Sequence, residues 1–415
     1  MSLIISAPAS GSGKTTITLG LLRALTRQGT PVRAAKSGPD YIDPRFHAAA
    51  CGQDCVNLDA WAMGADQIKA LAAGPTPLMI EGAMGLFDGA PPDGKGATAD
   101  LARLLDLQVI LVVDAGRMAG SVAPLVQGFA RFDPEVRIAG VILNNLGSAR
   151  HEGMLRRALG DIPVLGAIPR CKDITQPSRH LGLVQAQEHP DLQAFLDRAA
   201  DLIADHCDIT AIKALLGSMP GHAPQPLGPP AQRIAIARDA AFAFTYPHLL
   251  EGWQRAGASL SFFSPLVDEA PAKADLIYLP GGYPELHAAR LAQNKTFLDG
   301  LRDTNAQIYG ECGGYMVLGE TLTDADGVTH KMAGLLALET SFASRKLHLG
   351  YRALHANAGP FAGAWKGHEF HYATTSRAEG TPLFHATDAE GATLPPMGLI
   401  QDNVAGSFAH IIARA

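Results

Sequence analysis

The sequence predicts two α/β domains, the first with a parallel sheet, and three observations lead to this fold class. The apolar run at residues 3–5 leads directly into the glycine-rich stretch PASGSGKTT at residues 8–16. Short β-rich segments at residues 77–80 and 109–113 alternate with amphipathic segments such as residues 17–28, which is the pattern of a parallel sheet covered by helices. The same alternation begins again in the second half of the chain, after a segment rich in proline and glycine.

The domain boundary is predicted at that proline- and glycine-rich stretch, GSMPGHAPQPLGPPAQ at residues 217–232. We expect a first domain over residues 1–217, a linker over 218–231 and a second domain over 232–415. At 415 residues the chain is long enough for each domain to bury its own core. The second domain has candidate strands at residues 234–237, 276–279 and 307–309.

Composition and charge exclude several classes of protein. Hydrophobic residues make up 47% of the chain, but no uninterrupted apolar run reaches the roughly 18 residues that cross a bilayer. The N-terminal run shows no export-signal pattern, so we expect a cytoplasmic protein that binds no membrane. Five cysteines without a Cys-x-x-Cys pair predict neither a disulfide framework nor a zinc site. A formal charge of -6 gives no reason to expect binding to nucleic acid.

The stretch PASGSGKTT has the features of a phosphate-binding loop. Gly11 and Gly13 allow the backbone to curl until its N–H groups face a phosphate. Lys14 adds a positive charge, and Thr15 offers a hydroxyl group to Mg2+. The usual pattern has glycine where this chain has Pro8, so an accidental Gly-Lys-Thr in a glycine-rich turn is the alternative. The residues expected to hold the nucleotide are Gly11, Ser12, Gly13, Lys14, Thr15, Thr16 and Lys36.

Carboxylates that could complete a Mg2+ shell follow two of the predicted strands. Glu81 ends an apolar strand, and Asp88 follows it in LMIEGAMGLFDG. Asp40 and Asp43 lie in KSGPDYIDP, a turn after the strand expected at residues 32–35. Aspartate beside glycine and proline is also common in ordinary turns, which is the alternative for all three aspartates. A carboxylate that ends an apolar strand beside glycine has little structural use, so Glu81 is the strongest of these candidates.

A second candidate site lies at QIYGECGGYMVLGE, where a predicted strand passes through Cys312 into a helix. A tight turn of this kind exposes its nucleophile, and the N–H groups at the helix start can stabilise a thiolate and an oxyanion. Gly281 and Gly282 in LIYLPGGYPE end a neighbouring strand and, with Gly313, could complete an oxyanion hole. His410 in GSFAHIIARA is the expected base for the thiol. The four other cysteines are expected to be small buried side chains.

Six stretches, in this order along nearly the whole chain, resemble one family: SGSGKTT, KSGPDYIDPRFH, IEGAMGLFDG, RHLGL, LPGGYPELHA and GECGGYM. They resemble the cobyrinic acid and hydrogenobyrinic acid a,c-diamide synthases of cobalamin biosynthesis. The first domain of that family is similar to dethiobiotin synthetase, a P-loop protein whose phosphate loop also lacks the usual first glycine, as at Pro8. The second domain is similar to the class I glutamine amidotransferases.

Two features depart from the class I amidotransferases. Ile412 stands where the usual His-x-Glu carboxylate would be, and Tyr315 and Met316 follow the turn in place of the usual glutamine. Cysteine and histidine would then act as a dyad, or an orienting group would come from elsewhere. If His410 is not the base, His368 or His371 in GHEFHY would be, although a structural or substrate-contacting role is expected for these two histidines.

The resemblance implies a two-site reaction. Glutamine is hydrolysed at Cys312 through a thioester, His410 moves the proton, and ammonia passes to the other domain. There ATP and Mg2+ convert a substrate carboxylate into an acyl phosphate that ammonia displaces, first at one and then at the other of the a and c acetate groups. Lys14 and Thr15 would hold phosphate and metal. The remaining roles implied are Asp40 and Glu81 as metal ligands, Tyr41, Ile42, Asp43 and Asp88 at the corrinoid and acyl-phosphate site, and Arg179 and His180 at substrate carboxylates, nucleotide or a packed helix start. The expected assembly is a homodimer.

Alternatives remain open within and outside this class. The nickel-sirohydrochlorin a,c-diamide synthases share both domains and are harder to exclude than cobyric acid synthase, which lacks the GPDYIDP stretch. A nucleotide-dependent switch or partitioning ATPase would need no nucleophile, so Cys312 argues against it. The sequence leaves open whether the corrin carries cobalt. Alanine- and glycine-rich composition, similar to that of aerobic proteobacterial members, favours the metal-free hydrogenobyrinic acid.

Overall fold

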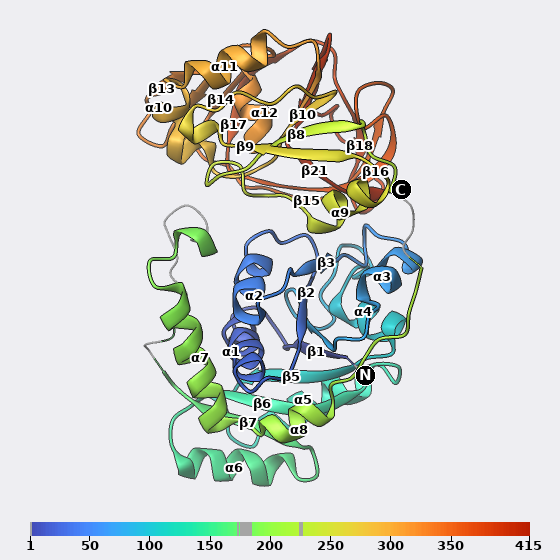
Figure 1. Cartoon of the computed structure of the whole chain (residues 1–415). Helices are drawn as coiled ribbons and strands as arrows, with labels where there is room; N and C mark the ends of the chain where they lie inside the picture. The colour runs from blue at the N-terminus through green and yellow to red at the C-terminus, as the bar shows by residue number, and fades with distance from the viewer. Residues whose placement is uncertain (1, 172–173, 175–184, 224–226) are drawn as a thin grey trace. The chain divides into compact units, whose positions relative to one another are not determined.

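The computed structural model describes residues 2–171, 174, 185–223 and 227–415 (Figure 1). The chain divides into two compact units, Met1–Gln225 and Pro226–Ala415. The RHLGL stretch at residues 179–183, with Arg179 and His180, lies outside the described residues.

The N-terminal unit is built on a seven-stranded parallel sheet with the order β3-β2-β4-β1-β5-β6-β7. Its strands are β1 (Leu3–Ser6), β2 (Arg33–Ser37), β3 (Val56–Leu58), β4 (Leu78–Glu81), β5 (Gln108–Asp114), β6 (Ile138–Leu146) and β7 (Val164–Pro169). Its helices are α1 (Lys14–Arg27), α2 (Asp43–Cys51), α3 (Ala65–Ala72), α4 (Thr98–Leu105), α5 (Val122–Phe132), α6 (Ala149–Leu159), α7 (Leu192–His206) and α8 (Ile209–Ala214), with a 3-10 turn, η1, at Ala186–Glu188.

The central strands of this sheet are buried on both faces, which explains their continuous apolar runs. Helix α1 packs against α2 and α7 and contributes leucines to one hydrophobic core with β1. The strands that the alternation predicted at residues 3–5, 77–80 and 109–113 are confirmed. Because all these strands run parallel, their carboxyl ends meet at one edge of the sheet, where ligands bind in open α/β folds.

The C-terminal unit contains a six-stranded sheet and two four-stranded sheets. The orders are β19-β20-β11-β10-β8-β9, then β13-β12-β14-β17 and β18-β15-β16-β21. Strands of the first sheet are β8 (Arg233–Ala237), β9 (Ser259–Phe263), β10 (Leu276–Leu279), β11 (Gln307–Glu311), β19 (Leu399–Gln401) and β20 (Val404–Ser407). The other strands are β12 (Thr321–Thr323), β13 (Thr329–Lys331), β14 (Ala337–Ser341), β15 (His348–Ala356), β16 (Gly363–His371), β17 (Thr374–Glu379), β18 (His385–Thr387) and β21 (Ala409–Arg414). The helices are α9 (Pro247–Arg255), α10 (Ala288–Leu291), α11 (Lys295–Arg302) and α12 (Gly313–Leu318), with 3-10 turns η2 (Pro265–Val267) and η3 (Pro284–His287).

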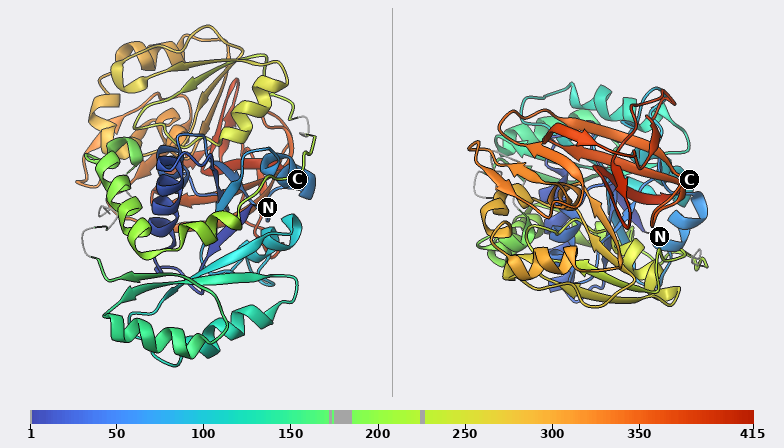
Figure 2. Two further views of the ribbon diagram at one scale, coloured as in Figure 1. Left: turned by 60° about the horizontal axis from the view of Figure 1, so that its bottom comes forward. Right: turned by 90° about the horizontal axis from the view of Figure 1, so that it is seen from above.

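The antiparallel part of this unit was not predicted from the sequence. Strands β15 and β16 form a nine-residue antiparallel pair, and β21 joins β16 (orange to red strands in Figure 2). Buried and more exposed residues alternate along β16, so the strand has no continuous apolar run to reveal it. This pairing matters for function because β21 carries His410.

Among the described residues, no helix is both long and apolar enough to cross a bilayer.

Candidate active sites

The glycine-rich loop connects β1 to α1 and ends at Gly13, which has a φ of 90°. This conformation favours glycine, and a Cβ atom at Gly13 would also clash with the side-chain amide of Asn144. That amide, on β6, donates a hydrogen bond to the carbonyl oxygen of Ser12 at 3.0 Å. Asn144, which the sequence analysis did not single out, therefore holds the loop in shape from a strand far along the chain.

Lys14 opens helix α1 and is largely buried. Its Nζ donates to the carbonyl oxygen of Met84 at 2.6 Å, in the segment that follows β4. Burial lowers the pKa of Lys14, and the charge of Glu81 opposes this shift. Asp43 and Asp88 also oppose it, so Lys14, Glu81, Asp43 and Asp88 form one cluster of charged groups, referred to below as the pocket.

Glu81 lies at the centre of that pocket and is fully buried. Its Oε1 accepts hydrogen bonds from Thr15 Oγ1 at 2.6 Å and from Lys36 Nζ at 2.8 Å, and its Oε2 lies 2.5 Å from His47 Nε2. Burial alone would raise the pKa of Glu81, but Lys36 and His47 outweigh it and hold the pKa well below its ordinary value. Glu81 is therefore a carboxylate anion throughout the physiological pH range.

Lys36 lies beside Glu81 because the two residues are register partners at the ends of β2 and β4. Its Nζ also lies 2.6 Å from Asp43 Oδ2, in the first turn of α2. Burial opposes charging, but Glu81 and then Asp43 raise the pKa of Lys36 above its ordinary value. The structure thus places this ammonium group between two carboxylates, in the pocket where the sequence analysis expected it to hold nucleotide.

Asp40 and Asp88 have backbone partners. Asp40 Oδ1 accepts from the N–H groups of Ile42 and Asp43 at 2.7 and 3.2 Å, and Asp88 Oδ2 accepts from the N–H of Gly85 at 2.9 Å. Burial and the neighbouring Asp43 raise the pKa of Asp40 to about 6. One Asp40 oxygen thus organises the turn before α2, as the turn-chemistry alternative held.

Tyr41 and Ile42 lie in the turn before α2. Both residues are half-buried, and Ile42 packs against the hydrophobic core. Their role as substrate residues stays a prediction.

His47 is a pocket residue to which the sequence analysis gave no role. It lies four residues after Asp43 on α2, so both side chains point from one face of this helix into the pocket. Cys55 Sγ lies 3.7 Å from His47 Nδ1, and burial raises the pKa of that thiol well above its ordinary value. His47 thus has a partner at each ring nitrogen, Cys55 at Nδ1 and Glu81 at Nε2, which fixes the orientation of the ring. The helical spacing of Asp43 and His47 within DYIDPRFH was the available signal.

In the C-terminal unit, β11 leads through Cys312 into α12 by the predicted sharp turn. Cys312 has a φ of 47°, a strained value for a residue with a side chain, and its N–H donates to the carbonyl oxygen of Ser407 at 2.8 Å. Cys51 and Cys55 are buried as expected, whereas Cys171 and Cys207 are only partly buried.

The predicted oxyanion glycines surround Cys312. A Cβ atom at Gly281 would clash with the His410 ring and lie 3.4 Å from the Cβ of Cys312. A Cβ atom at Gly313 would lie 3.1 Å from the backbone nitrogen of Gly282. Side chains at Gly281 and Gly313 would therefore crowd the surroundings of Cys312, and the role of these glycines in an oxyanion hole stays a prediction.

His410 on β21 is buried and hydrogen-bonds with the Cys312 side chain. Its Nδ1 lies 3.4 Å from Glu311 Oε2. Burial disfavours the charged ring, but the charges of Cys312 and Glu311 outweigh it and raise the pKa of His410 to about 10. The ring is therefore an imidazolium at neutral pH.

Glu311 was not a candidate in the sequence analysis. Its side chain is buried, its Oε2 accepts from the Tyr278 hydroxyl at 2.8 Å, and its Oε1 accepts from the N–H of Ile411 at 3.1 Å. A carboxylate directly before the nucleophile, at the end of a buried strand, was the available signal.

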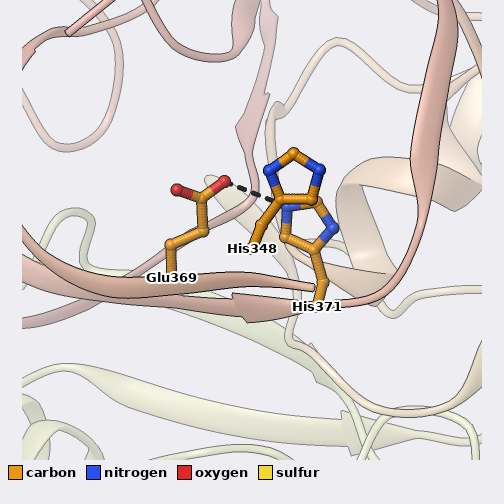
Figure 3. A group of neighbouring side chains, drawn as sticks. All are labelled: His348, Glu369 and His371. Atoms are coloured by element: carbon orange, nitrogen blue, oxygen red, sulfur yellow. Dashed lines mark hydrogen bonds and ion pairs between the residues drawn. The ribbon is translucent and has the colours of Figure 1, made fainter. Parts of the chain in front are cut away.

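The two alternative bases differ in their surroundings. His368 is the register partner of His410 across β16 and β21, and burial and then His410 lower its pKa to about 3. His371 stacks on His348, with ring centroids 4.6 Å apart, and its Nε2 lies 3.0 Å from Glu369 Oε1 (Figure 3). These three side chains are donors of the kind that bind metals, but the Arg352 guanidinium lies 2.7 Å from Glu369 Oε2 and already balances the carboxylate. We interpret this cluster as an internal ion pair.

Comparison with known proteins identifies a family for each of the two units. Residues 3–184 match the family of CobQ/CobB/MinD/ParA nucleotide binding domains, and residues 233–415 match the CobB/CobQ-like glutamine amidotransferase domains. Fold and sites thus define a nucleotide-binding domain joined to a glutamine amidotransferase domain.

Several relatives match along nearly their whole length. The chain is 56% identical to hydrogenobyrinate a,c-diamide synthase of Brucella anthropi over 428 residues, which covers 99% of this chain and 98% of the relative. The proteins of the same name from Rhizobium meliloti and Rhodobacter capsulatus are 53% and 51% identical with the same coverage. The chain belongs to the hydrogenobyrinate a,c-diamide synthase family.

Proposed function

We propose that this protein is an ATP-dependent, glutamine-hydrolysing synthase that converts the a and c acetate groups of hydrogenobyrinic acid into amides. One observation carries the proposal. The chain belongs to this family, and it has both a nucleophile in a sharp turn, Cys312, and a hydrogen-bonded Thr15–Glu81 pair beside a glycine-rich loop. The first site releases ammonia, and the second activates a carboxylate with ATP.

In the glutaminase site, Cys312 Sγ attacks the side-chain carbonyl carbon of glutamine. The new C–S bond places negative charge on the carbonyl oxygen, which the N–H groups at Gly281, Gly282 and Gly313 would stabilise. His410 gives its proton to the departing nitrogen, so ammonia leaves and a thioester remains. Water then attacks the thioester, the C–S bond breaks, and glutamate and the Cys312–His410 pair are regenerated.

In the amidation site, an oxygen of the corrinoid carboxylate attacks the γ-phosphorus of ATP, and ADP leaves. Ammonia then attacks the carbonyl carbon of the acyl phosphate, and inorganic phosphate departs with the C–O bond that breaks. Lys14 and the backbone N–H groups of the loop hold the phosphates. Each amide therefore consumes one ATP and one glutamine.

Thr15 Oγ1 and Glu81 Oε1, 2.6 Å apart, are oxygen donors of the kind Mg2+ prefers. Asp40, in the turn before α2, would be the third oxygen ligand. Mg2+ bound there would offset the negative charge that develops on the transferred phosphoryl group. Lys36 and His47 keep Glu81 charged and in position.

Amide formation with each of three tetrapyrroles tests the proposal. The enzyme would be incubated with ATP, Mg2+, glutamine and either hydrogenobyrinic acid, cobyrinic acid or nickel sirohydrochlorin, and the products would be read by mass. We expect two amides on hydrogenobyrinic acid. If only cobyrinic acid or only nickel sirohydrochlorin were converted efficiently into a diamide, that compound would be the substrate. Glutamine hydrolysis without amidation of any of the three would contradict the synthase assignment.

A further inference from the structure

We propose that Glu311 is the carboxylate that orients His410, in the role that a glutamate two residues after the histidine would otherwise fill. A histidine that moves protons needs its far nitrogen fixed, because an unfixed ring samples the wrong tautomer and orientation. At the position two residues after His410 this chain has Ile412, which is apolar and fully buried. This inference deepens the proposed glutaminase site and rests on it.

The geometry places Glu311 and Cys312 at the same imidazole ring. His410 hydrogen-bonds with Cys312, and its Nδ1 lies 3.4 Å from Glu311 Oε2. The Tyr278 hydroxyl and the Ile411 N–H hold one carboxylate oxygen each, so the carboxylate cannot turn away from the ring. The ring is thus held between two consecutive residues of the chain.

The strained backbone at Cys312 makes this arrangement possible. Consecutive side chains of a regular strand point to opposite faces, so residues 311 and 312 of a straight strand could not both reach one ring. The positive φ of Cys312 turns the thiol toward the ring that Glu311 faces from β11. The turn therefore exposes the nucleophile and also brings it to the same histidine as the carboxylate.

A purely structural role does not require the charge. A neutral amide could accept from the Ile411 N–H through its oxygen and donate through its nitrogen to the Tyr278 hydroxyl oxygen, because a hydroxyl can also act as acceptor. A buried carboxylate costs several kcal/mol unless a cation lies beside it. The charged or titratable groups that face His410 are Glu311 from β11, Cys312 from the turn and His368 from β16. Because the pKa of His368 is lowered to about 3, that ring is neutral, and His410 is the cation that Glu311 faces.

The test compares Glu311→Gln with the wild type in glutamine hydrolysis. We expect kcat to fall by on the order of 10²- to 10⁴-fold with little change in KM. The basic limb of the kcat/KM profile, where His410 loses its proton, should move to lower pH, because the amide no longer stabilises the imidazolium. Glu369→Gln, which alters a buried carboxylate paired with Arg352 and His371, is the matched control and should leave that profile unchanged.

Two further measurements keep the inference distinct from protein folding and from the proposed function. Glu311→Gln should still form amides from ammonium salts. If the wild type forms none in that assay, the proposed function is wrong, and the orienting role is then judged on glutamine hydrolysis alone. Tyr278→Phe keeps the charge but frees one carboxylate oxygen, so a roughly tenfold loss and a smaller shift of the basic limb are expected. A folded Glu311→Gln enzyme with a normal rate and profile overturns the proposal. If Glu311→Gln does not fold, an unchanged pH profile of kcat/KM in Tyr278→Phe overturns the proposal instead.

Discussion

Replacing Glu81 by glutamine removes one negative charge from the centre of the proposed ATP site while nearly preserving the side-chain shape. At the 2.8 Å separation from Lys36 Nζ, the gross attraction is about 6 kcal/mol for an effective dielectric constant of about 20. Much of this is offset, because the burial cost of Glu81 disappears and Asp43 still pairs with Lys36 at 2.6 Å. We expect a net loss of stability of about 3 kcal/mol, the lower end for breaking a buried pair.

The expected effect on catalysis is larger than the effect on folding. Glu81→Gln should nearly stop ATP-dependent amidation with ammonium as donor, because the oxygen beside Thr15 no longer carries the charge that offsets Mg2+. Cys312 should remain reactive toward a thiol reagent. The assays are amidation at varied Mg2+ concentration, thiol labelling, and urea unfolding followed for the N-terminal unit.

An exposed carboxylate in the same unit provides the control. Asp197 pairs with Arg23 on the surface, so Asp197→Asn should cost less than about 1 kcal/mol and leave amidation intact. Normal amidation by Glu81→Gln at limiting Mg2+ would refute the reasoning, and Asp40 or Asp43 would then have to carry the metal.

Three further results are expected. Cys312→Ala should abolish glutamine-dependent amidation but not amidation from ammonium salts; loss of both in a folded variant would argue against two separable sites. His410→Asn should lower glutaminase turnover by roughly 10²- to 10⁴-fold, and a near-normal rate would point to His368 as the base. Because the pKa of Asp40 is raised to about 6, Mg2+ should bind more weakly as the pH falls through this value, whereas in Asp40→Asn Mg2+ titrations of amidation should show no such dependence. The same raised pKa affects stability. The contribution of Asp40 to the free energy of unfolding is fully favourable only below the ordinary pKa of aspartate, and it is lost as the pH rises through about 6. Urea unfolding of the wild type and of Asp40→Asn over this pH range would show the loss.

The parallel sheet could be predicted from the sequence because strands that are buried on both faces consist of short apolar runs. The alternation located β1, β4, β5, β10 and β11 with small errors at their ends. Strands β15 and β16 escaped because their burial alternates and histidines and charged residues interrupt them. Their pairing depends on contacts that a local pattern does not contain.

The candidate residues were predictable where their chemistry is concentrated in one stretch. The loop with Lys14 and the turn with Cys312 each form one continuous segment. Asn144, His47 and Glu311 act on those segments from elsewhere in the fold or by an unusual backbone angle, so only three-dimensional contacts reveal them. The sequence also left open whether Cys312 and His410 act alone or with an orienting carboxylate from elsewhere. The answer depends on which carboxylate lies next to His410 in the fold.

The close approach at Gly281 has a genetic consequence. A single-base change in a glycine codon can produce alanine, and here the added methyl group would occupy the place of the His410 ring. We expect the altered chain still to fold, because the nearest atoms belong to the side chains of His410 and Cys312 and not to the backbone. In a chain that folds, the lesion would fall on the ammonia supply alone, and amide formation would depend on free ammonium. Variation at this codon would then be limited by nitrogen metabolism.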